Sequence, residues 1–181
     1  MMQVQQAQQF TFPEVGDWFV LHTRSRQEKI LAADLEAMRV GYFLPLVPQV
    51  RYYGKRKVMV SLPMFPGYLF VRGSKDEAYV ADRTKRVAQI ISVTNQVLLD
   101  VELRNIHLAV SQQAPLDPYP YLVKGQWVEV RSGPFRGLQG VVEDRLNPTR
   151  LLLQVEMLCR SMSLEIDASL LDPIDDPPAL L

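Results

Sequence analysis

The chain has 181 residues, of which 48% are hydrophobic and 22% are charged, so it can bury one large core or two small ones and is not a wholly disordered protein. Its 20 basic and 20 acidic residues cancel, which excludes a uniformly basic coat for nucleic acid. The charge is uneven, however. Residues 1–110 carry 14 basic and 10 acidic residues, and residues 111–181 carry 6 and 10, so the two parts are expected to bind different partners.

The few residues of catalytic or metal-binding type do not form a recognisable site. Cys159 is the only cysteine, and the two histidines, His22 and His107, are distant in sequence, so neither a disulfide nor a zinc site is expected. We therefore expect no enzyme activity, no cofactor and no metal. The first nine residues lack a signal peptide, and no stretch of about 20 apolar residues could span a membrane, so we expect a cytoplasmic protein.

The amino-terminal part begins with a Gln-rich stretch, residues 1–16, which we expect to be a flexible arm. Residues 17–21 are aromatic and β-branched and predict a buried strand. A helix follows, because Ser25 and Glu28 have the spacing of a capping box and an apolar face recurs every three or four residues. The residues of that face are Leu31, Leu35 and Met38.

Strands and helices alternate through the rest of this part, which predicts one α+β domain over residues 17–110. Two prolines make residues 42–48 an edge or irregular strand, and residues 51–60 predict a hairpin with a cationic tip. The remaining predicted elements are a turn and strand at 65–71, a helix at 75–85, a strand at 87–92 and a helix at 100–110.

The composition changes after residue 110. Residues 111–124 are rich in proline and predict a semi-stiff linker. Four short strand candidates follow within residues 125–172, and such closely spaced strands are typical of a small closed barrel. The glycines of residues 133–140 indicate a tight turn of that barrel, because no lysine follows them as a phosphate-binding loop would require. The last residues, 173–181, are expected to form a frayed tail.

These motifs resemble those of a known family. Residues 125–142 resemble a KOW motif, and residues 18–21 together with 62–71 resemble an NGN domain. Their order and the proline-rich join are similar to the NusG family of transcription elongation factors. The resemblance implies an α+β NGN domain, with an antiparallel sheet packed with helices, followed by a small all-β SH3-like KOW barrel. Residues 40–60 and 160–167 look most like the specialised RfaH and UpxY-like paralogues.

The resemblance implies a transcription elongation and antitermination factor without chemistry of its own. In the family, the NGN domain binds the clamp helices of the RNA polymerase β′ subunit and reaches the β subunit, which suppresses pausing. The positions that map onto this contact are His22, Phe65, Tyr68 and Phe70. Strand alternation places Phe65 with Leu69 on one face and Tyr68 with Phe70 on the other, so some of these aromatics belong to the core.

The family also runs over the non-template DNA strand, and cations attract its phosphates whatever the base. The candidate nucleic-acid contacts are Arg24, Arg26, Lys55, Arg56, Lys57, Arg83, Lys85 and Arg86. The alternative is that these residues form an ordinary solvated face.

In the KOW domain, the loop that selects a protein partner maps onto residues 157–160. The resemblance therefore implies that Met157, Leu158 and Arg160 contact the ribosomal protein NusE or the termination factor Rho, and we expect the chain to act as a monomer. The competing hypothesis is a ribosome-associated or RNA-binding KOW protein. The acidic balance of residues 111–181 argues against it.

Overall fold

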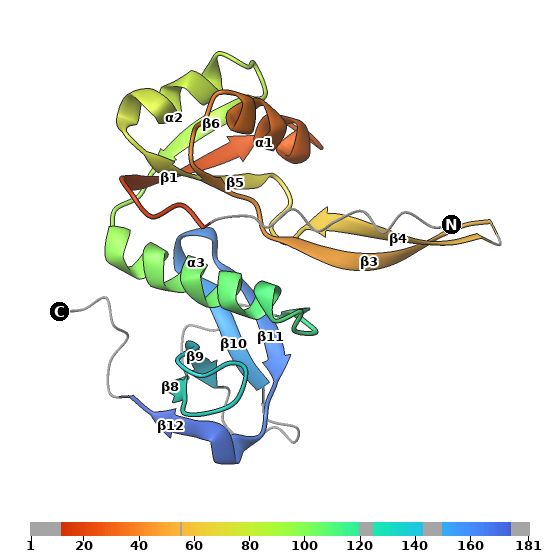
Figure 1. Ribbon diagram of the computed structural model, residues 1–181, viewed down its shortest axis with the longest axis vertical. Coiled ribbons are helices and arrows are strands. Elements are labelled where there is room, and N and C mark those ends of the chain that lie inside the picture. The colour runs from red at the N-terminus through yellow and green to blue at the C-terminus, as the bar shows by residue number, and fades with distance from the viewer. Residues whose placement is uncertain (1–11, 55, 120–124, 143–149, 175–181) are drawn as a thin grey trace.

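The computed structural model describes residues 12–54, 56–119, 125–142 and 150–174. In these residues the helices are α1 (Glu28–Ala37), α2 (Lys75–Asp82) and α3 (Gln96–Ser111), and two short 3₁₀ helices lie at Glu156–Leu158 (η1) and Ala168–Leu170 (η2). The strands before α3 are β1 (Asp17–Thr23), β2 (Tyr42–Phe43), β3 (Leu46–Tyr53), β4 (Arg56–Pro63), β5 (Tyr68–Gly73) and β6 (Val87–Ser92). Those after it are β7 (Asp117–Tyr119), β8 (Gln126–Val130), β9 (Gln139–Val142), β10 (Arg150–Val155), β11 (Arg160–Glu165) and β12 (Leu171–Pro173) (Figure 1).

The first sheet has the strand order β2-β5-β1-β6, and its neighbouring strands are antiparallel. Helices α1 and α2 cover one face, and α3 lies on the other (Figure 1). Because side chains alternate along β5, Leu69 joins the core under α1 and α2, whereas Phe70 joins the core on the α3 side. The α+β domain with an antiparallel sheet predicted from the sequence is confirmed.

Helix α1 begins differently from the prediction. The capping box expected at Ser25 is wrong, because the N-cap residue is Gln27 and its side chain makes no cap hydrogen bond. Glu28 instead turns inward, where its Oε1 accepts a hydrogen bond from the backbone N–H of Gly67 at 2.7 Å. Leu31 and Leu35 are fully buried as expected, but Met38 lies at the end of the helix and is exposed.

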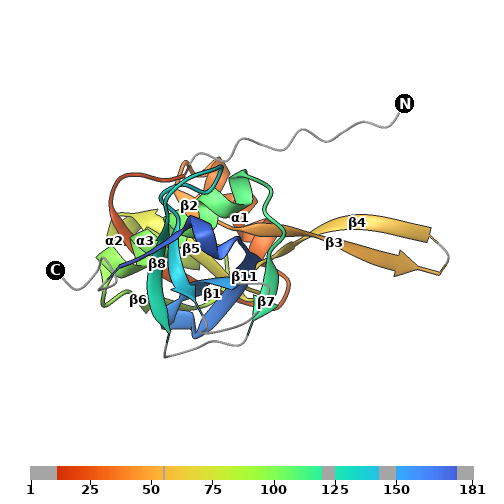
Figure 2. The same cartoon turned by 90° about the horizontal axis from the view of Figure 1, so that it is seen from below.

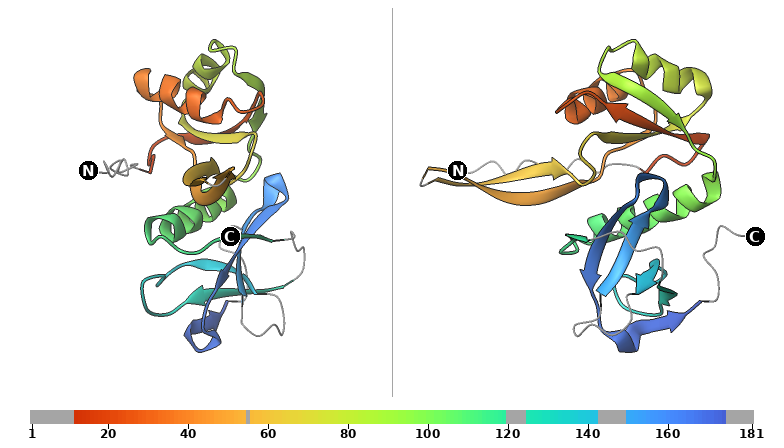
Figure 3. Two further views of the ribbon diagram at one scale, coloured as in Figure 1. Left: turned by 90° about the vertical axis from the view of Figure 1, so that its right-hand side faces the viewer. Right: turned by 180° about the vertical axis from the view of Figure 1, so that it is seen from behind.

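Helix α3 lies between the first sheet and the second (Figure 3). Its apolar residues belong to one buried cluster that includes residues of both sheets, such as Val20 in β1 and Leu153 in β10. The buried residues of α3 are Leu99, Glu102, Leu103, Asn105, Ile106 and Ala109. A helix buried this far around its circumference behaves as a core element rather than a surface helix.

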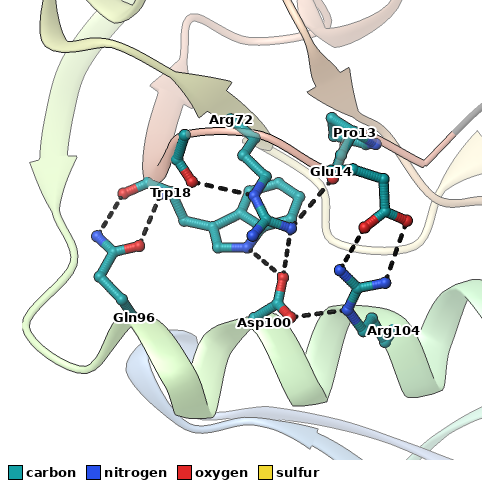
Figure 4. A network of polar contacts seen from close by, with 8 residues as sticks. Pro13, Glu14, Trp18, Arg72, Gln96, Asp100 and Arg104 are labelled. Carbon is teal, nitrogen blue, oxygen red and sulfur yellow. Dashed lines mark hydrogen bonds and ion pairs between the residues drawn. The ribbon is translucent and has the colours of Figure 1, made fainter.

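A polar network fixes α3 to the first sheet (Figure 4). Asp100 accepts hydrogen bonds from Trp18 Nε1 at 2.9 Å and from Arg72 Nη1 at 2.6 Å, and its second oxygen pairs with Arg104 at 2.7 Å. Burial acts to raise the pKa of Asp100. The hydrogen bonds from Arg104 and Trp18, with the charge of Arg72, outweigh burial and hold the pKa below its ordinary value.

Part of the expected amino-terminal arm is ordered. Residues 1–11 lie outside the described residues, but Phe12 is buried, with its ring 5.5 Å from Trp18 and 5.3 Å from Phe43. Arg104, already bound to Asp100, also pairs with Glu14 at 2.7 Å. The expectation of a flexible arm is therefore wrong for residues 12–16, because an aromatic ring and an ion pair attach them to the first sheet and α3.

The second sheet has the order β12-β8-β9-β10-β11-β7. The four strands expected after residue 125 correspond to β8, β9, β10 and β11, and the all-β character of this part is confirmed. Strand β7 lies within the segment expected to be a linker and pairs with β11, so that expectation is wrong for residues 117–119. Pro118 is compatible with β7 because β7 lies at the edge of the sheet, where a missing N–H breaks no ladder. Residues 120–124 and 175–181 lie outside the described residues.

Strands β3 and β4 form a separate two-stranded ribbon, residues 46–63, which extends away from the rest of the molecule (Figure 2). Its register pairs Leu46 with Pro63 at the base and Tyr53 with Arg56 at the end. The hairpin predicted over residues 51–60 is confirmed and is longer than expected.

Candidate functional site

The four positions expected to contact a partner protein lie on and beside β1 and β5. His22 and Tyr68 are register partners on these antiparallel strands, and their rings stack with centroids 5.3 Å apart and an interplanar angle of 27°. His22 is exposed and Tyr68 is half-buried. These two side chains therefore present an aromatic surface at one end of the β1/β5 pair.

The turn before β5 is held by three local features. Gly67 adopts a φ of +86°, a conformation that L-residues with side chains rarely take. Its N–H donates to Glu28, and its carbonyl accepts a hydrogen bond from the N–H of Thr23 at 2.8 Å. The turn is thus attached to both α1 and β1, which fixes the position of Tyr68 against His22.

Phe65 and Phe70 are buried instead of lining an open groove. Phe70 has no exposed surface and Phe65 has 2%. Their rings contact each other edge to face at 6.1 Å, and Phe70 also lies 6.4 Å from Phe43. Alternation correctly placed Tyr68 and Phe70 on one side, but the assignment of Phe65 to the side of Leu69 is wrong, because Phe65 precedes the strand and packs with Phe70. Neither ring can touch a partner in this conformation.

The candidate nucleic-acid residues fall into two places. One group surrounds the loop before α1 and the loop before β6, which are joined by the hydrogen bond from Arg24 N to the Arg86 carbonyl at 2.8 Å. The exposed cations of this group are Arg24, Arg26, Arg83 and Lys85. None of these four forms an ion pair with another described residue. Together they provide four exposed cations that are not ion-paired within the described residues.

Arg86 differs from the other cations of this group. Its guanidinium pairs with Asp34 at 2.7 Å and donates to Gln27 Oε1 at 2.7 Å, and the side chain is half-buried. Arg86 is therefore already ion-paired in this structure, and its contact with nucleic acid stays a prediction. Arg86 joins the β6 loop to α1 and so positions the neighbouring exposed cations.

The second group lies at the end of the ribbon, away from the first group (Figure 2). Arg56 and Lys57 are exposed there and form no ion pair within residues 12–54, 56–119, 125–142 and 150–174. Lys55 lies outside the described residues. Sequence reasoning did not single out Tyr52 and Tyr53, which are exposed beside these cations.

In the second sheet, the expected partner loop lies at η1 and its end. Met157 and Arg160 are exposed, whereas Leu158 is half-buried and packs against the cluster around α3. The N–H of Glu156, which begins η1, donates to Glu102 Oε1 of α3 at 2.9 Å. The structure therefore holds the start of this loop against α3.

Glu102 is an unusual residue for a helix packed between two sheets. Burial raises its pKa to about 8, the hydrogen bond from the Glu156 N–H opposes that rise, and the negative charge of Glu156 adds to it. A second polar contact lies close by, where Asn105 Oδ1 accepts the N–H of Gln139 at 3.0 Å. These two side chains satisfy backbone donors of η1 and β9.

No group of three or more His, Cys, Asp or Glu side chains within the described part of the chain could hold a metal ion. Among the same residues, no helix is both long and apolar enough to cross a membrane.

Comparison with known families decides the assignment. A family model described as "Transcription termination factor nusG" matches residues 16–108, a little more than half the chain, and the KOW motif matches residues 124–151. The chain belongs to the NusG family. The order of the NGN and KOW parts expected from the sequence is thereby confirmed. It is a transcription factor and not an enzyme, and proteins of the NusG family generally bind RNA polymerase.

The chain is also similar to individual proteins. The chain is 29% identical over 180 residues to "Transcription termination/antitermination protein NusG" of Thermus thermophilus. The alignment covers 84% of this chain and 96% of that protein. Among solved structures, "Domain interaction in Thermotoga maritima NusG" is 21% identical with a TM-score of 0.46 and covers 88% and 97% of the two chains. The structure described as "Crystal Structure of MjSpt4:Spt5 complex conformation A" is 18% identical with a TM-score of 0.26 and covers 87% of this chain and 97% of that chain.

Proposed function

We propose that this NusG-family protein is a transcription elongation and antitermination factor. In this proposal the NGN part, residues 17–110, binds the β′ clamp helices of RNA polymerase, reaches the β subunit and suppresses pausing. The KOW part, residues 125–172, recruits a second protein. The observation that carries the proposal is the match of a NusG model followed by a KOW motif along one chain. The name of the Thermus relative, which includes antitermination, supports it.

The polymerase contact is assigned to the surface of His22 and Tyr68. Aromatic side chains are common anchors of protein interfaces, and these two are stacked and partly solvent-exposed. Phe65 and Phe70 lie behind them in the core and support the turn that carries Tyr68. Their part in the contact is thus positional.

The non-template DNA strand is assigned to the exposed cations. One contact surface consists of Arg24, Arg26, Arg83 and Lys85. The other consists of Arg56 and Lys57, which follow Lys55 in the sequence. A backbone contact of this kind carries no sequence information, because phosphates are the same at every base. Reversing Arg56 and Lys57 to Glu should reduce crosslinking to the non-template strand, and unchanged crosslinks would remove the ribbon from the DNA contact.

The KOW partner is assigned to the loop that contains Met157, Leu158 and Arg160, with NusE or Rho as the protein bound. Met157 and Arg160 are the exposed members of this set. We further propose a cytoplasmic monomer and a place among the specialised RfaH and UpxY-like paralogues, on the sequence of residues 40–60 and 160–167.

A single-round elongation assay with purified RNA polymerase tests the function. The chain should shorten pauses and raise the fraction of full-length RNA, and a His22→Ala/Tyr68→Ala double variant should lose this effect. Tyr79→Ala is the matched control, since Tyr79 is an exposed aromatic on α2. Repeating the assay with Rho separates pause suppression from control of termination. Pause lifetimes that do not change on addition of the wild-type chain would contradict the proposal.

A further inference from the structure

The ribbon of β3 and β4 has side chains that no part of the described chain covers. The two strands pair only with each other, and the ribbon extends from the body of the molecule in each view (Figures 1 and 2). An isolated two-stranded ribbon is marginally stable in water, because it has no hydrophobic face packed on a core. Its exposed apolar residues therefore contribute little to folding, and a binding role explains them better.

The register places one tyrosine and one cation together on each face of the ribbon end. Tyr52 is directly opposite Lys57, and Tyr53 is directly opposite Arg56. Because successive side chains alternate, the two pairs lie on opposite faces. Directly opposite residues have Cβ atoms about 5 Å apart, so each tyrosine is the cross-strand neighbour of a basic residue.

The rings are open to solvent. Tyr52 is 70% exposed and Tyr53 is 61% exposed. On the face of Tyr52, the next cross-strand pair is Val50 with Met59, and Met59 is 64% exposed. An aromatic ring that is open to solvent offers a face on which a nucleobase can stack, and the apolar side chains beside it extend the contact.

The charge of the ribbon and its flanking residues favours a polyanion as the ligand. The sequence from Gly41 to Gly73 contains five Lys or Arg residues and no Asp or Glu. An acidic protein surface could also pack on the exposed rings. The single strand that the proposed function places near the NGN part favours a nucleic acid instead. Unpaired bases match both the charge and the rings, since each nucleotide brings one phosphate and one aromatic face. In a duplex the faces of the bases are stacked on one another and are not available to a tyrosine.

We propose that the end of the ribbon binds single-stranded DNA, with bases stacked on Tyr52 and Tyr53 and phosphates held by Lys57 and Arg56. This inference rests on the proposed function, in which the non-template strand is the single strand near the NGN part. It adds base stacking to a contact that was assigned to phosphates alone. Stacking on tyrosine tolerates any base, so the ribbon follows the strand without selecting a sequence.

The test is fluorescence anisotropy of a labelled single-stranded oligonucleotide of mixed sequence, titrated with the full-length chain at several salt concentrations. Tyr52→Ala/Tyr53→Ala should weaken binding about thirtyfold or more, because it removes two stacks that contribute on the order of 1 kcal/mol or more each. The slope of log affinity against log salt should stay unchanged, because no phosphate contact is lost. Arg56→Gln/Lys57→Gln should instead reduce that slope by about 0.7 for each phosphate contact removed.

Two further variants keep the result interpretable. Tyr52→Leu/Tyr53→Leu retains apolar bulk on the strands without an aromatic face, and it should lose affinity as the alanine variant does. Tyr79→Ala is the matched control, because Tyr79 is 52% exposed on α2 with the Lys75 ammonium 5.8 Å from its ring centroid. Its affinity for the oligonucleotide should equal that of the wild type.

Wild-type affinity in both tyrosine double variants would overturn the inference. If Arg56→Gln/Lys57→Gln then still reduced the salt slope, the ribbon would bind DNA through charge alone. Equal affinity for a duplex of the same sequence would overturn it too, because paired bases cannot stack on the rings. The proposed function fails separately, when the wild-type chain binds the oligonucleotide through its tyrosines but leaves polymerase pausing unchanged.

Discussion

Helix α3 and the β3–β4 ribbon both carry apolar side chains on more than one side, yet their surroundings are opposite. Leu99 and Leu103 of α3 are buried between two sheets, whereas Val50 and Met59 of the ribbon are exposed. The difference shows that an apolar pattern does not by itself define a core. Elements packed on both sides determine stability, whereas the exposed end of the ribbon is free to bind a partner.

The largest expected effect comes from a buried ring on the α3 side of the first sheet. Phe70→Ala should lower the free energy of unfolding by about 3–5 kcal/mol, because the ring has no exposed surface and its removal leaves a cavity. Urea unfolding followed by circular dichroism measures the change. Tyr52→Ala on the ribbon is the control and should stay within about 0.5 kcal/mol of the wild type. A small loss of stability for Phe70→Ala, with a large loss of polymerase binding, would show instead that the ring lines an open groove.

Leu103→Ala tests whether α3 is a core element. The side chain is fully buried, so the variant should lose about 2–5 kcal/mol in the same unfolding experiment. Val97→Ala on the same helix is the matched control, since Val97 is 58% exposed and its truncation should change stability by less than about 0.5 kcal/mol. Equal effects of the two substitutions would mean that α3 is not a core element in solution.

Because of Glu102, the stability of the contact between α3 and the second sheet depends on pH. Its pKa is raised to about 8 by burial, so the folded protein keeps a proton that the unfolded chain releases above about pH 4.5. The stabilising contribution of the protonated carboxyl is complete below that pH and is lost as pH rises to about 8. The total loss is on the order of a few kcal/mol.

Glu102→Gln should remove this dependence, since the amide keeps an oxygen that accepts the Glu156 N–H and carries no charge. Urea unfolding at pH 5, 7 and 9 should show the variant gaining stability over the wild type as pH rises. A difference between the two proteins that is constant with pH would contradict the raised pKa.

The smallest expected effect lies on the ribbon. Met59→Ser replaces an exposed apolar side chain and should change the free energy of unfolding by less than about 0.5 kcal/mol. Thermal unfolding compared with the wild type measures this. A loss as large as that of Leu103→Ala would show that the ribbon is covered by another part of the molecule.

Sequence patterns predicted the elements that depend on neighbouring residues. The cationic hairpin, the strand β6 and the apolar face of α1 with Leu31 and Leu35 follow from local periodicity and turn residues, and the structure contains all of them. The matches to the NusG model and the KOW motif confirm the family for the same reason, since both motifs are contiguous in sequence.

What the sequence patterns missed concerns partners that are distant in sequence. Glu28 has the spacing of a capping residue, but its carboxylate binds Gly67, 39 residues away. Arg86 is one of several cations in sequence, and only the fold brings it to Asp34. Phe70 alternates like a groove residue, and its burial depends on α3 and Phe43. Local patterns do not contain this information, because tertiary packing decides which face of a strand is covered.

The central claim is that the NGN part binds RNA polymerase through the clamp helices. Its most direct test is an equilibrium titration of the full-length chain with core RNA polymerase, repeated with polymerase from which the β′ clamp helices have been deleted. We expect saturable binding to the intact enzyme and loss of that binding after the deletion. Equal affinity for the two polymerases would contradict the claim.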